Sequence, residues 1–289
     1  MWETVTPGSW AELVEALYAD SWDAGLRRHR SPYAFRGMVD DWRLETSLSR
    51  LAGPTEVLER HLLRNFRKYA HGDVVESDSV WHWLTLAQHH GLPTRLLDWT
   101  YSPFVALHFA TDDLEAMDTD GVIWMVDIAR THERLPEVLR RTLADEGSLV
   151  FTVEMLARLG GGGLARQGGS EAVGGLAELD ALGREAPFLL FLEPPSIDQR
   201  LVNQFALSSL LPDPGLRLDD WLAGNPELCR RVAVPAALKW EARDKLDQAN
   251  VTERVLFPGL DGLGRWLRRH YSRRDAPPDR RRRCRGEEE

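Results

Sequence analysis

A few polar side chains interrupt segments that are otherwise apolar, and these residues are the first candidates for chemistry. Arg36 lies in the run Tyr33–Met38, while Arg95, Asp98 and Thr100 lie in or beside a second apolar run. A polar group in a buried element costs about 1–3 kcal/mol unless it is hydrogen-bonded. These residues therefore belong either to a structural network or to a binding site.

Arg36 is the most informative of them, because its run alternates large apolar and small or polar residues as a strand does. An arginine on a core strand needs an anion nearby, which is either an internal carboxylate or a bound phosphate. Both alternatives remain open. Gly37 follows it and permits close approach by a backbone or a ligand.

The familiar catalytic patterns are missing from the sequence. We find no Ser-His-Asp order, no nucleophile elbow and no kinase motif set. The histidines lack the spacing of metal ligands, so no metal is predicted. They are His82, His89, His90 and His108. The chemistry must come from another arrangement.

The segment Gln88–Ala110 must position several of these side chains. Gly91 and Pro93 predict the end of a helix, and Leu96–Thr100 predicts a short strand. Ser102 before Pro103 is typical of a helix N-cap with proline at the first position. A strand thus leads into a helix through a tight turn. We expect three aromatic residues here to be buried in the core: Trp99, Phe104 and Phe109.

Strand-like runs alternate with amphipathic helices along the whole chain, which predicts an α/β (α+β) domain with a central mixed sheet flanked by helices. The expected strands lie near Phe35, Leu97, Ile123, Leu190, Leu207 and Val232.

We divide the chain into an N-terminal helical segment (1–32), one domain (33–271) and a disordered charged tail (272–289). Glycines cluster between residues 147 and 186, where we expect a flexible insertion in the domain.

Composition narrows the class of protein. The 289 residues carry a net charge of −9, which argues against general nucleic-acid binding, although the arginine-rich run 280–285 keeps a nucleic-acid contact open. The two cysteines make no disulfide framework. No apolar run is long enough to cross a membrane, and no signal pattern opens the chain. A cytoplasmic protein without membrane contact is expected.

Four separated motifs resemble the FRG domain family, named for its Phe-Arg-Gly triplet. They are Phe35–Gly37, Gln88–Ala110, Arg200 with Gln204, and Leu256–Gly262. The resemblance runs from Tyr33 to Tyr271 and keeps the expected order. The family name supplies no reaction.

The order of these residues is also similar to the signature of ADP-ribosyltransferases, whose Arg-Gly strand, Ser/Thr strand and late Glu-bearing strand surround NAD. The likeness implies NAD as the substrate. It places the pyrophosphate at Arg36 and Gly37, and the nicotinamide ribose at Thr100 or Ser102. The implied site also includes Arg95, Trp99 and Tyr101 as binding residues, and Asp98, Ser102 and Gln204 as catalytic residues.

Gln204 departs from the transferase pattern, because an amide neither stabilises positive charge nor acts as a base as a glutamate does. Asp98 would then have to supply the charge. Three interpretations remain open: an NAD-using effector in a toxin or anti-phage role, a non-catalytic module that binds NAD or another phosphate-bearing molecule or a partner, and a nuclease or other hydrolase. A nuclease would need clustered metal ligands. The acceptor of a transferase is not identified by the sequence.

Overall fold

The computed structural model describes residues 2–41, 43–51, 53–70, 79–161, 174–196 and 198–274. Its centre is an eight-stranded sheet in the order β1-β10-β6-β4-β5-β9-β8-β7. The strands are β1 (Glu3–Val5), β4 (Tyr33–Met38), β5 (Leu97–Thr100), β6 (Gly121–Asp127), β7 (Phe151–Thr152), β8 (Leu190–Glu193), β9 (Ala206–Leu210) and β10 (Cys229–Val234). The pairs β1–β10 and β7–β8 are parallel and the others antiparallel, so the predicted mixed sheet is confirmed.

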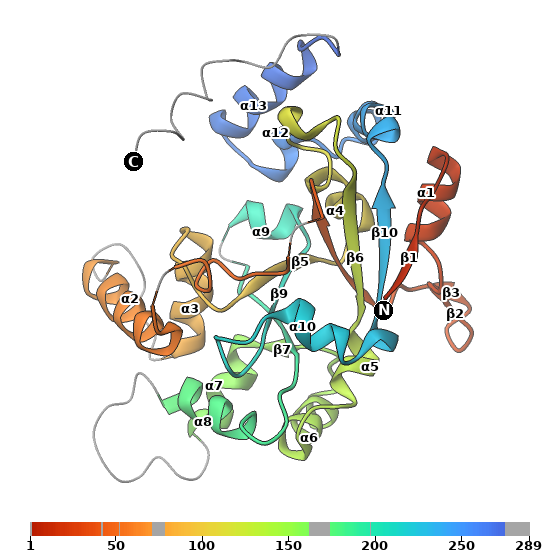
Figure 1. Cartoon of the computed structure of the whole chain (residues 1–289). Helices are drawn as coiled ribbons and strands as arrows, with labels where there is room; N and C mark the ends of the chain where they lie inside the picture. Colours follow the sequence, from red (N-terminus) through yellow and green to blue (C-terminus); the bar gives the residue numbers. More distant parts are fainter. Residues whose placement is uncertain are drawn as a thin grey trace.

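Helices flank this sheet, as predicted (Figure 1). The longer ones are α1 (Trp10–Leu17), α2 (Thr55–Ala70), α3 (Val80–His89), α6 (Glu137–Glu146), α7 (Val153–Gly161), α8 (Gly174–Leu182), α11 (Ala236–Gln248) and α13 (Leu260–His270). The shorter ones are α4 (Pro103–Phe109), α5 (Ile128–His132), α9 (Gln199–Asn203), α10 (Leu218–Ala223), α12 (Glu253–Leu256), η1 (Leu114–Ala116) and η2 (Pro226–Leu228).

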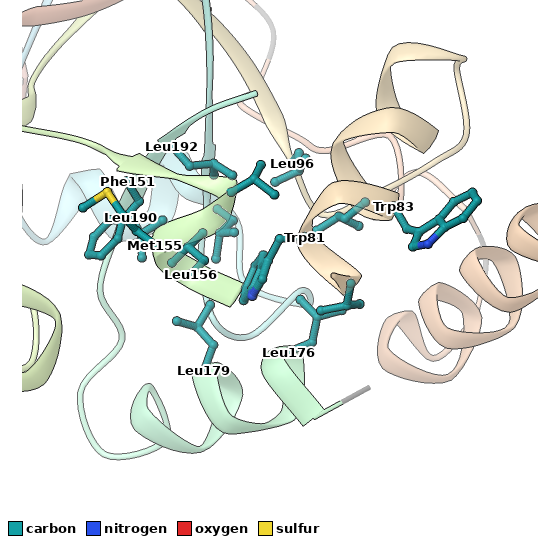
Figure 2. Close-up of a cluster of buried hydrophobic side chains, with 14 of the residues drawn as sticks. Trp81, Trp83, Leu96, Phe151, Met155, Leu156, Leu176, Leu179, Leu190 and Leu192 are labelled. Atoms are coloured by element: carbon teal, nitrogen blue, oxygen red, sulfur yellow. The ribbon is translucent and has the colours of Figure 1, made fainter. Parts of the chain in front are cut away.

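The sheet is divided between β4 and β5, which pair at the single position Phe35–Thr100. On its other side β4 pairs with β6 over its whole length. The two halves carry separate helix layers on one face. Helices α1, α4 and α11 cover β4, β6 and β10, whereas α2, α3, α7 and α8 cover the half with β8 and β9. Figure 2 shows the second of these cores, built around Trp81 and Phe151.

Gly37 explains how the first layer comes so close to the sheet. A Cβ atom on Gly37 would lie 1.7 Å from the carbonyl oxygen of Ala106 in α4. Only glycine allows the helix backbone to rest there. Of the two occupants expected beside Gly37, a backbone or a ligand, the backbone of α4 is the one present.

The N-terminal segment 1–32 differs from the expected helical segment. Helix α1 ends at Leu17, and Asp20 adopts a positive φ of 56° that a continuing helix does not tolerate. A hairpin of β2 (Trp22–Asp23) and β3 (Arg28–His29) follows. Strand β1 pairs with β10, so this segment completes the sheet and is no separate appendage.

The expected insertion at 147–186 also needs correction where it is described. Strand β7 joins the sheet beside β8, and α7 and α8 bury Met155, Leu156, Leu176 and Leu179 in the core. The burial of these apolar residues at helical spacing stabilises the two helices by more than the nearby glycines destabilise them. Residues 162–173, which hold four of those glycines, and residues 275–289 of the expected tail lie outside the described residues.

Among the described residues, no helix has both the length and the apolar character that a membrane span requires.

Candidate ligand-binding cleft

A cleft of about 1050 Å³ opens where β4 and β5 separate. Its walls come from β4 and the segment after it, α3, β5, α9 and β9. Six residues that the sequence placed at a site line it together: Arg36, Gly37, Asp98, Trp99, Thr100 and Gln204. Other charged or polar residues of the lining are Asp41, Arg43, Glu45, Arg50, Gln88, His89, Arg200 and Ser208.

Arg36 bridges the gap between the two strands. Its Nη1 donates a hydrogen bond of 2.6 Å to the backbone carbonyl of Asp98, while its buried Nε has no partner among the described residues. Burial lowers the pKa of this guanidinium, and the nearby Asp98 carboxylate opposes that shift. The salt bridge to an internal carboxylate, one of the two alternatives, does not form with any described residue.

Asp98 contributes a carboxylate to the lining of this cleft. Strand alternation turns it toward the cleft, since Leu97 and Trp99 are buried while Asp98 is exposed. Both carboxylate oxygens accept from Nε2 of Gln88, at 3.1 and 3.2 Å. Gln88 is oriented in turn by the Thr94 hydroxyl, which donates to its Oε1 at 2.5 Å. A hydrogen-bonded chain therefore holds the Asp98 carboxylate in place.

Gln204 lies at the C-cap of α9, two residues before β9 begins. Its Nε2 donates to the backbone carbonyl of Leu256 at 2.9 Å, and its backbone carbonyl accepts from the Thr100 hydroxyl at 2.6 Å. Gln204 thus joins three of the motifs seen in the sequence, one through its side chain and one through its backbone. A glutamate here would place a carboxylate against the Leu256 carbonyl, which offers no proton.

Thr100 and Ser102 organise the turn between β5 and α4. The Thr100 hydroxyl accepts from the backbone N–H of Ser102 at 3.0 Å, and the Ser102 hydroxyl caps α4 by accepting from Val105 at 3.3 Å. Thr100 lines the cleft, but Ser102 does not. The N-cap expected at Ser102 is confirmed, and its placement gives no support to a catalytic role.

Three further residues of the predicted site are engaged elsewhere. Arg95 is buried, bonds Glu59 and Asp180, and lies outside the cleft. Trp99 borders the cleft, but its indole is buried and donates to Ser209 at 2.8 Å. The Tyr101 hydroxyl donates to Glu193 at 2.8 Å, away from the cleft lining.

The carboxylates that surround Arg95 affect its pKa strongly. Burial alone would lower it, but the charges and hydrogen bonds of Glu59 and Asp180 outweigh burial and raise it. Burial and the Glu193 carboxylate likewise raise the pKa of Tyr101. Both side chains are therefore satisfied inside the fold, and we do not carry them forward as cofactor-binding residues.

The sequence analysis missed several charged residues of the lining. Arg43 and Arg50 follow β4 in an irregular segment, where no periodic pattern singles them out. Phe109 was expected in the core; instead it is half-buried and lines the cleft, and Phe104 is half-buried as well. His89, considered above only as a metal ligand, pairs through its Nε2 with Asp198 at 2.6 Å.

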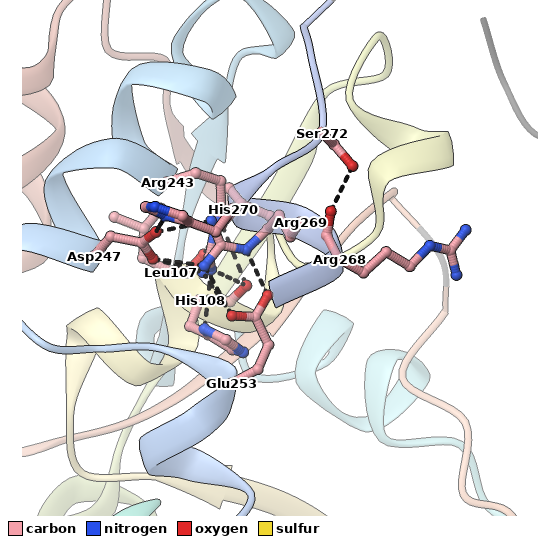
Figure 3. Close-up of polar contacts among 10 residues, drawn as sticks. Leu107, His108, Arg243, Asp247, Glu253, Arg268, Arg269, His270 and Ser272 are labelled. Carbon is pink, nitrogen blue, oxygen red and sulfur yellow. Dashed lines mark hydrogen bonds and ion pairs between the residues drawn. The ribbon is translucent and has the colours of Figure 1, made fainter. Parts of the chain in front are cut away.

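A buried ionic network fixes the elements behind the cleft. Arg269 of α13 bonds Glu253 at 2.5 and 2.8 Å and Asp247 at 2.6 and 3.0 Å (Figure 3). Arg243 approaches Nδ1 of His108 at 2.9 Å. Burial would raise the pKa of Glu253, but Arg269 and Arg243 lower it to about 2. The network anchors α12 and α13, and with them Phe257.

No group of three or more His, Cys, Asp or Glu side chains that could hold a metal ion occurs in the ranges that the structure describes.

Comparison with known proteins agrees with the first two motifs. Residues 31–119 match the family model of the FRG domain, which covers Phe35–Gly37 and Gln88–Ala110. The match does not reach Gln204 or Leu256–Gly262. No curated protein and no solved structure matches the chain. Residues 31–119 thus match the FRG domain, in agreement with the resemblance seen in the sequence.

Proposed function

We propose that the cleft binds NAD and that the chain uses it in ADP-ribosyl transfer or NAD hydrolysis. The observation that carries this proposal is Arg36, which lies at a cleft with Asp98 and Gln204 and meets no carboxylate among the described residues. A guanidinium without an internal anion is available to a phosphate, which its planar fork binds through two hydrogen bonds.

The other charges of the cleft support a phosphate-bearing ligand. Arg43, Arg50 and Arg200 line it as well, and none of them has a carboxylate within salt-bridge distance among the described residues. Asp41, an acidic residue of the lining, is already paired with Arg231. The volume of about 1050 Å³ slightly exceeds the range of about 300–1,000 Å³ typical of small-molecule sites, which suits a ligand the size of a dinucleotide.

Asp98 is the best candidate to assist the reaction itself. Breaking the bond between nicotinamide and ribose builds positive charge on the sugar, and a fixed carboxylate stabilises such charge. The two hydrogen bonds from Gln88 keep Asp98 oriented without neutralising it. In this proposal Arg36 anchors the pyrophosphate, Asp98 faces the ribose, and Gln204 shapes the wall through its bond to Leu256.

A non-catalytic binding module is the second candidate, and Gln204 favours it. Its amide lies where the transferase signature has a glutamate, and its N–H is committed to a backbone carbonyl. Such a module would bind the dinucleotide and leave it intact. A role in a toxin or in anti-phage defence fits the catalytic proposal, because loss of NAD arrests a cell; this role rests on the family resemblance.

Calorimetric titration with NAD tests the binding step. Arg36→Lys should weaken binding about tenfold or more, because lysine keeps the charge but loses the bidentate fork. Arg141→Lys is the matched control, since Arg141 is exposed on α6 and lies outside the cleft. Equal affinity in wild type and Arg36→Lys, with both folded by circular dichroism, would reject Arg36 as the anchor.

Release of nicotinamide separates the two candidates. A transferase or hydrolase should release it from NAD, and Asp98→Asn should slow release by about 100-fold or more while binding persists. Tight binding without release, with candidate acceptors present, would leave the binding module. Wild-type protein that is folded and does not bind NAD would exclude the transferase and leave a module that binds another phosphate-bearing molecule or a partner.

A further inference from the structure

A second cleft of about 560 Å³ adjoins the first. His89 and Arg200 line both clefts, so they form the boundary between them. The remaining wall of the second cleft includes Phe257, Asp261 and Arg265, which come from the segment around α12 and α13. The family match ends at residue 119, so neither the match nor the proposal for the first cleft assigns this wall a role.

Two arginines of this cleft converge on one aromatic ring. The guanidinium carbons of Arg200 and Arg265 lie 5.2 and 5.1 Å from the centre of the Phe257 ring. Neither has a carboxylate within salt-bridge distance among the described residues, although Asp261 also lines the cleft. Stacking on the ring limits where each guanidinium points and leaves its N–H groups free to bind an anion.

The ring that holds these arginines is itself well anchored. Phe257 meets Phe109 edge-on, with ring centres 6.1 Å apart. The buried pairs of Arg269 with Glu253 and Asp247 fix the helices on both sides of Phe257 (Figure 3). The second cleft therefore has a rigid wall, which reduces the conformational entropy that the protein loses when a ligand binds.

His89 is oriented at the boundary between the clefts. Its Nε2 bonds Oδ2 of Asp198 at 2.6 Å, and Oδ1 of Asp198 accepts from the backbone N–H of Leu201 at 3.1 Å. The carboxylate therefore holds the tautomer with the proton on Nε2. Nδ1 is then the nitrogen that can accept a proton. An imidazole oriented by a carboxylate is the usual arrangement of a general base.

We propose that the second cleft binds a phosphate-bearing acceptor that carries a hydroxyl group, with its phosphate on Arg200 and Arg265 and its hydroxyl toward His89. This inference rests on the proposed function, because it names the acceptor of the transfer from NAD. Two clustered arginines favour a phosphate, whose oxygens engage both forks, over a single amine or amide.

The transfer balances with these groups. The acceptor oxygen forms a bond to C1′ of the NAD ribose, and its proton passes to Nδ1 of His89. The bond from C1′ to the nicotinamide nitrogen breaks, and its electron pair neutralises the pyridinium charge of the departing nicotinamide. His89 returns the proton to solvent after the products leave.

A binding experiment tests the second cleft without requiring turnover. In an Arg36→Gln background, which weakens the first cleft, calorimetry with adenosine 5′-monophosphate should still detect a site. Adding Arg265→Gln should reduce that affinity roughly tenfold, because a charge-assisted hydrogen-bonding fork is lost. Arg268→Gln is the control, since Arg268 is exposed on the same helix but lines neither cleft. Equal affinity in the Arg265 and Arg268 variants would overturn the proposal.

The source of the phosphate is distinguished by a parallel titration with a short single-stranded oligonucleotide. Tighter binding of the oligonucleotide, lost in Arg265→Gln, would identify a nucleic-acid end as the acceptor, and preference for the mononucleotide would identify a free nucleotide. An NAD affinity that Arg265→Gln leaves unchanged shows that the first cleft is intact. A failure of the second cleft is thereby separated from a failure of NAD binding.

Chemical rescue tests His89. His89→Ala should lower the rate of transfer to the acceptor at least tenfold while both ligands still bind, and added imidazole should restore part of the rate. A merely structural histidine would not be rescued. Transfer that continues at the wild-type rate in His89→Ala, or wild-type protein that binds both ligands without transfer, would overturn its role as a base.

Discussion

Arg95 and Arg36 differ in what surrounds their charge. Arg95 lies 2.6 Å from Glu59 and 2.5 Å from Asp180, and its side chain is 3% exposed. Arg36 contacts a backbone carbonyl across the gap in the sheet and opens onto a cleft of about 1050 Å³. Arg269 resembles Arg95, since Glu253 and Asp247 surround it.

This difference predicts two classes of arginine: those that hold the fold and those that, in the proposed function, bind a ligand. Two carboxylates already balance the charge of such a buried arginine, and removing the arginine leaves the carboxylates without a counter-charge. An arginine at a cleft without a carboxylate gains its anion only on binding. Variants of the first kind should therefore affect stability, and variants of the second kind should affect affinity.

Arg95→Met should give the largest effect. Glu59 is buried, so it would lose its partner in a place where water cannot replace it, and the free energy of unfolding should fall by about 3–5 kcal/mol. Urea denaturation measures the change. Arg140→Met is the control, because its pair with Glu137 is solvent-exposed and should contribute about 0–1 kcal/mol. Similar losses in the two variants would remove the distinction drawn here.

Gln204→Glu should come next. The change replaces the N–H that reaches Leu256 with an oxygen, so we expect a loss of about 1–3 kcal/mol in the free energy of unfolding. We also expect no gain of NAD cleavage, because the new carboxylate would be repelled from its place. The same denaturation experiment and the nicotinamide assay check both outcomes. Faster cleavage by a stable Gln204→Glu protein would assign this position the role of the missing glutamate.

The ionic network behind the cleft should appear in the pH dependence of stability. The folded-state pKa of Glu253 is about 2, below its ordinary value of 4.5, because Arg269 and Arg243 overcome the effect of burial. A depressed carboxyl pKa stabilises the fold above pH 4.5, and this stability is lost as the pH falls toward 2.

Burial and the charge of Arg243 also lower the pKa of His108, from 6.5 to about 3, so protonation of the unfolded chain acts in the same direction. Between about pH 4.5 and 3, Glu253 should account for about 1–2 kcal/mol of lost stability. Glu253→Gln should flatten this part of a curve of unfolding free energy against pH. An unchanged slope would show that the network does not lower the pKa of Glu253.

Sequence patterns predicted most of the fold for a physical reason. Six strands are apolar runs whose alternation or burial is visible locally, and each was expected from that pattern. Strands β1 and β7 were missed because they contain three and two residues, too few for a period to appear. Helices α7 and α8 were missed because the glycines in and between them suggested a loop. The apolar residues of both helices nevertheless pack in the core.

The site was only partly predictable. Three separated motifs contribute Arg36, Asp98 and Gln204 to the lining of one cleft. The sequence could not distinguish Arg95 from Arg36, because the carboxylates that neutralise Arg95 lie 36 residues before it and 85 residues after it. Pairing over such separations depends on the tertiary fold, so it cannot be predicted from the local spacing of residues.

Arg50→Gln should give the smallest change in stability. Arg50 is exposed at the cleft and has no carboxylate partner among the described residues, so the unfolding free energy should change by no more than about 0.5 kcal/mol. If the cleft binds NAD, affinity should still fall about threefold to tenfold, because one of the cations that attract its phosphates is lost. This loss should shrink at high salt, where the charge of an exposed arginine is screened.

The control is Arg141→Gln, which removes the same charge from α6 outside the cleft and should leave NAD affinity unchanged. Calorimetry at two salt concentrations compares the pair. A stability loss in Arg50→Gln as large as that in Arg95→Met would mean that the cleft arginines also hold the fold. Equal NAD affinities in the Arg50 and Arg141 variants would mean that net charge, rather than the position of the arginine at the cleft, decides binding.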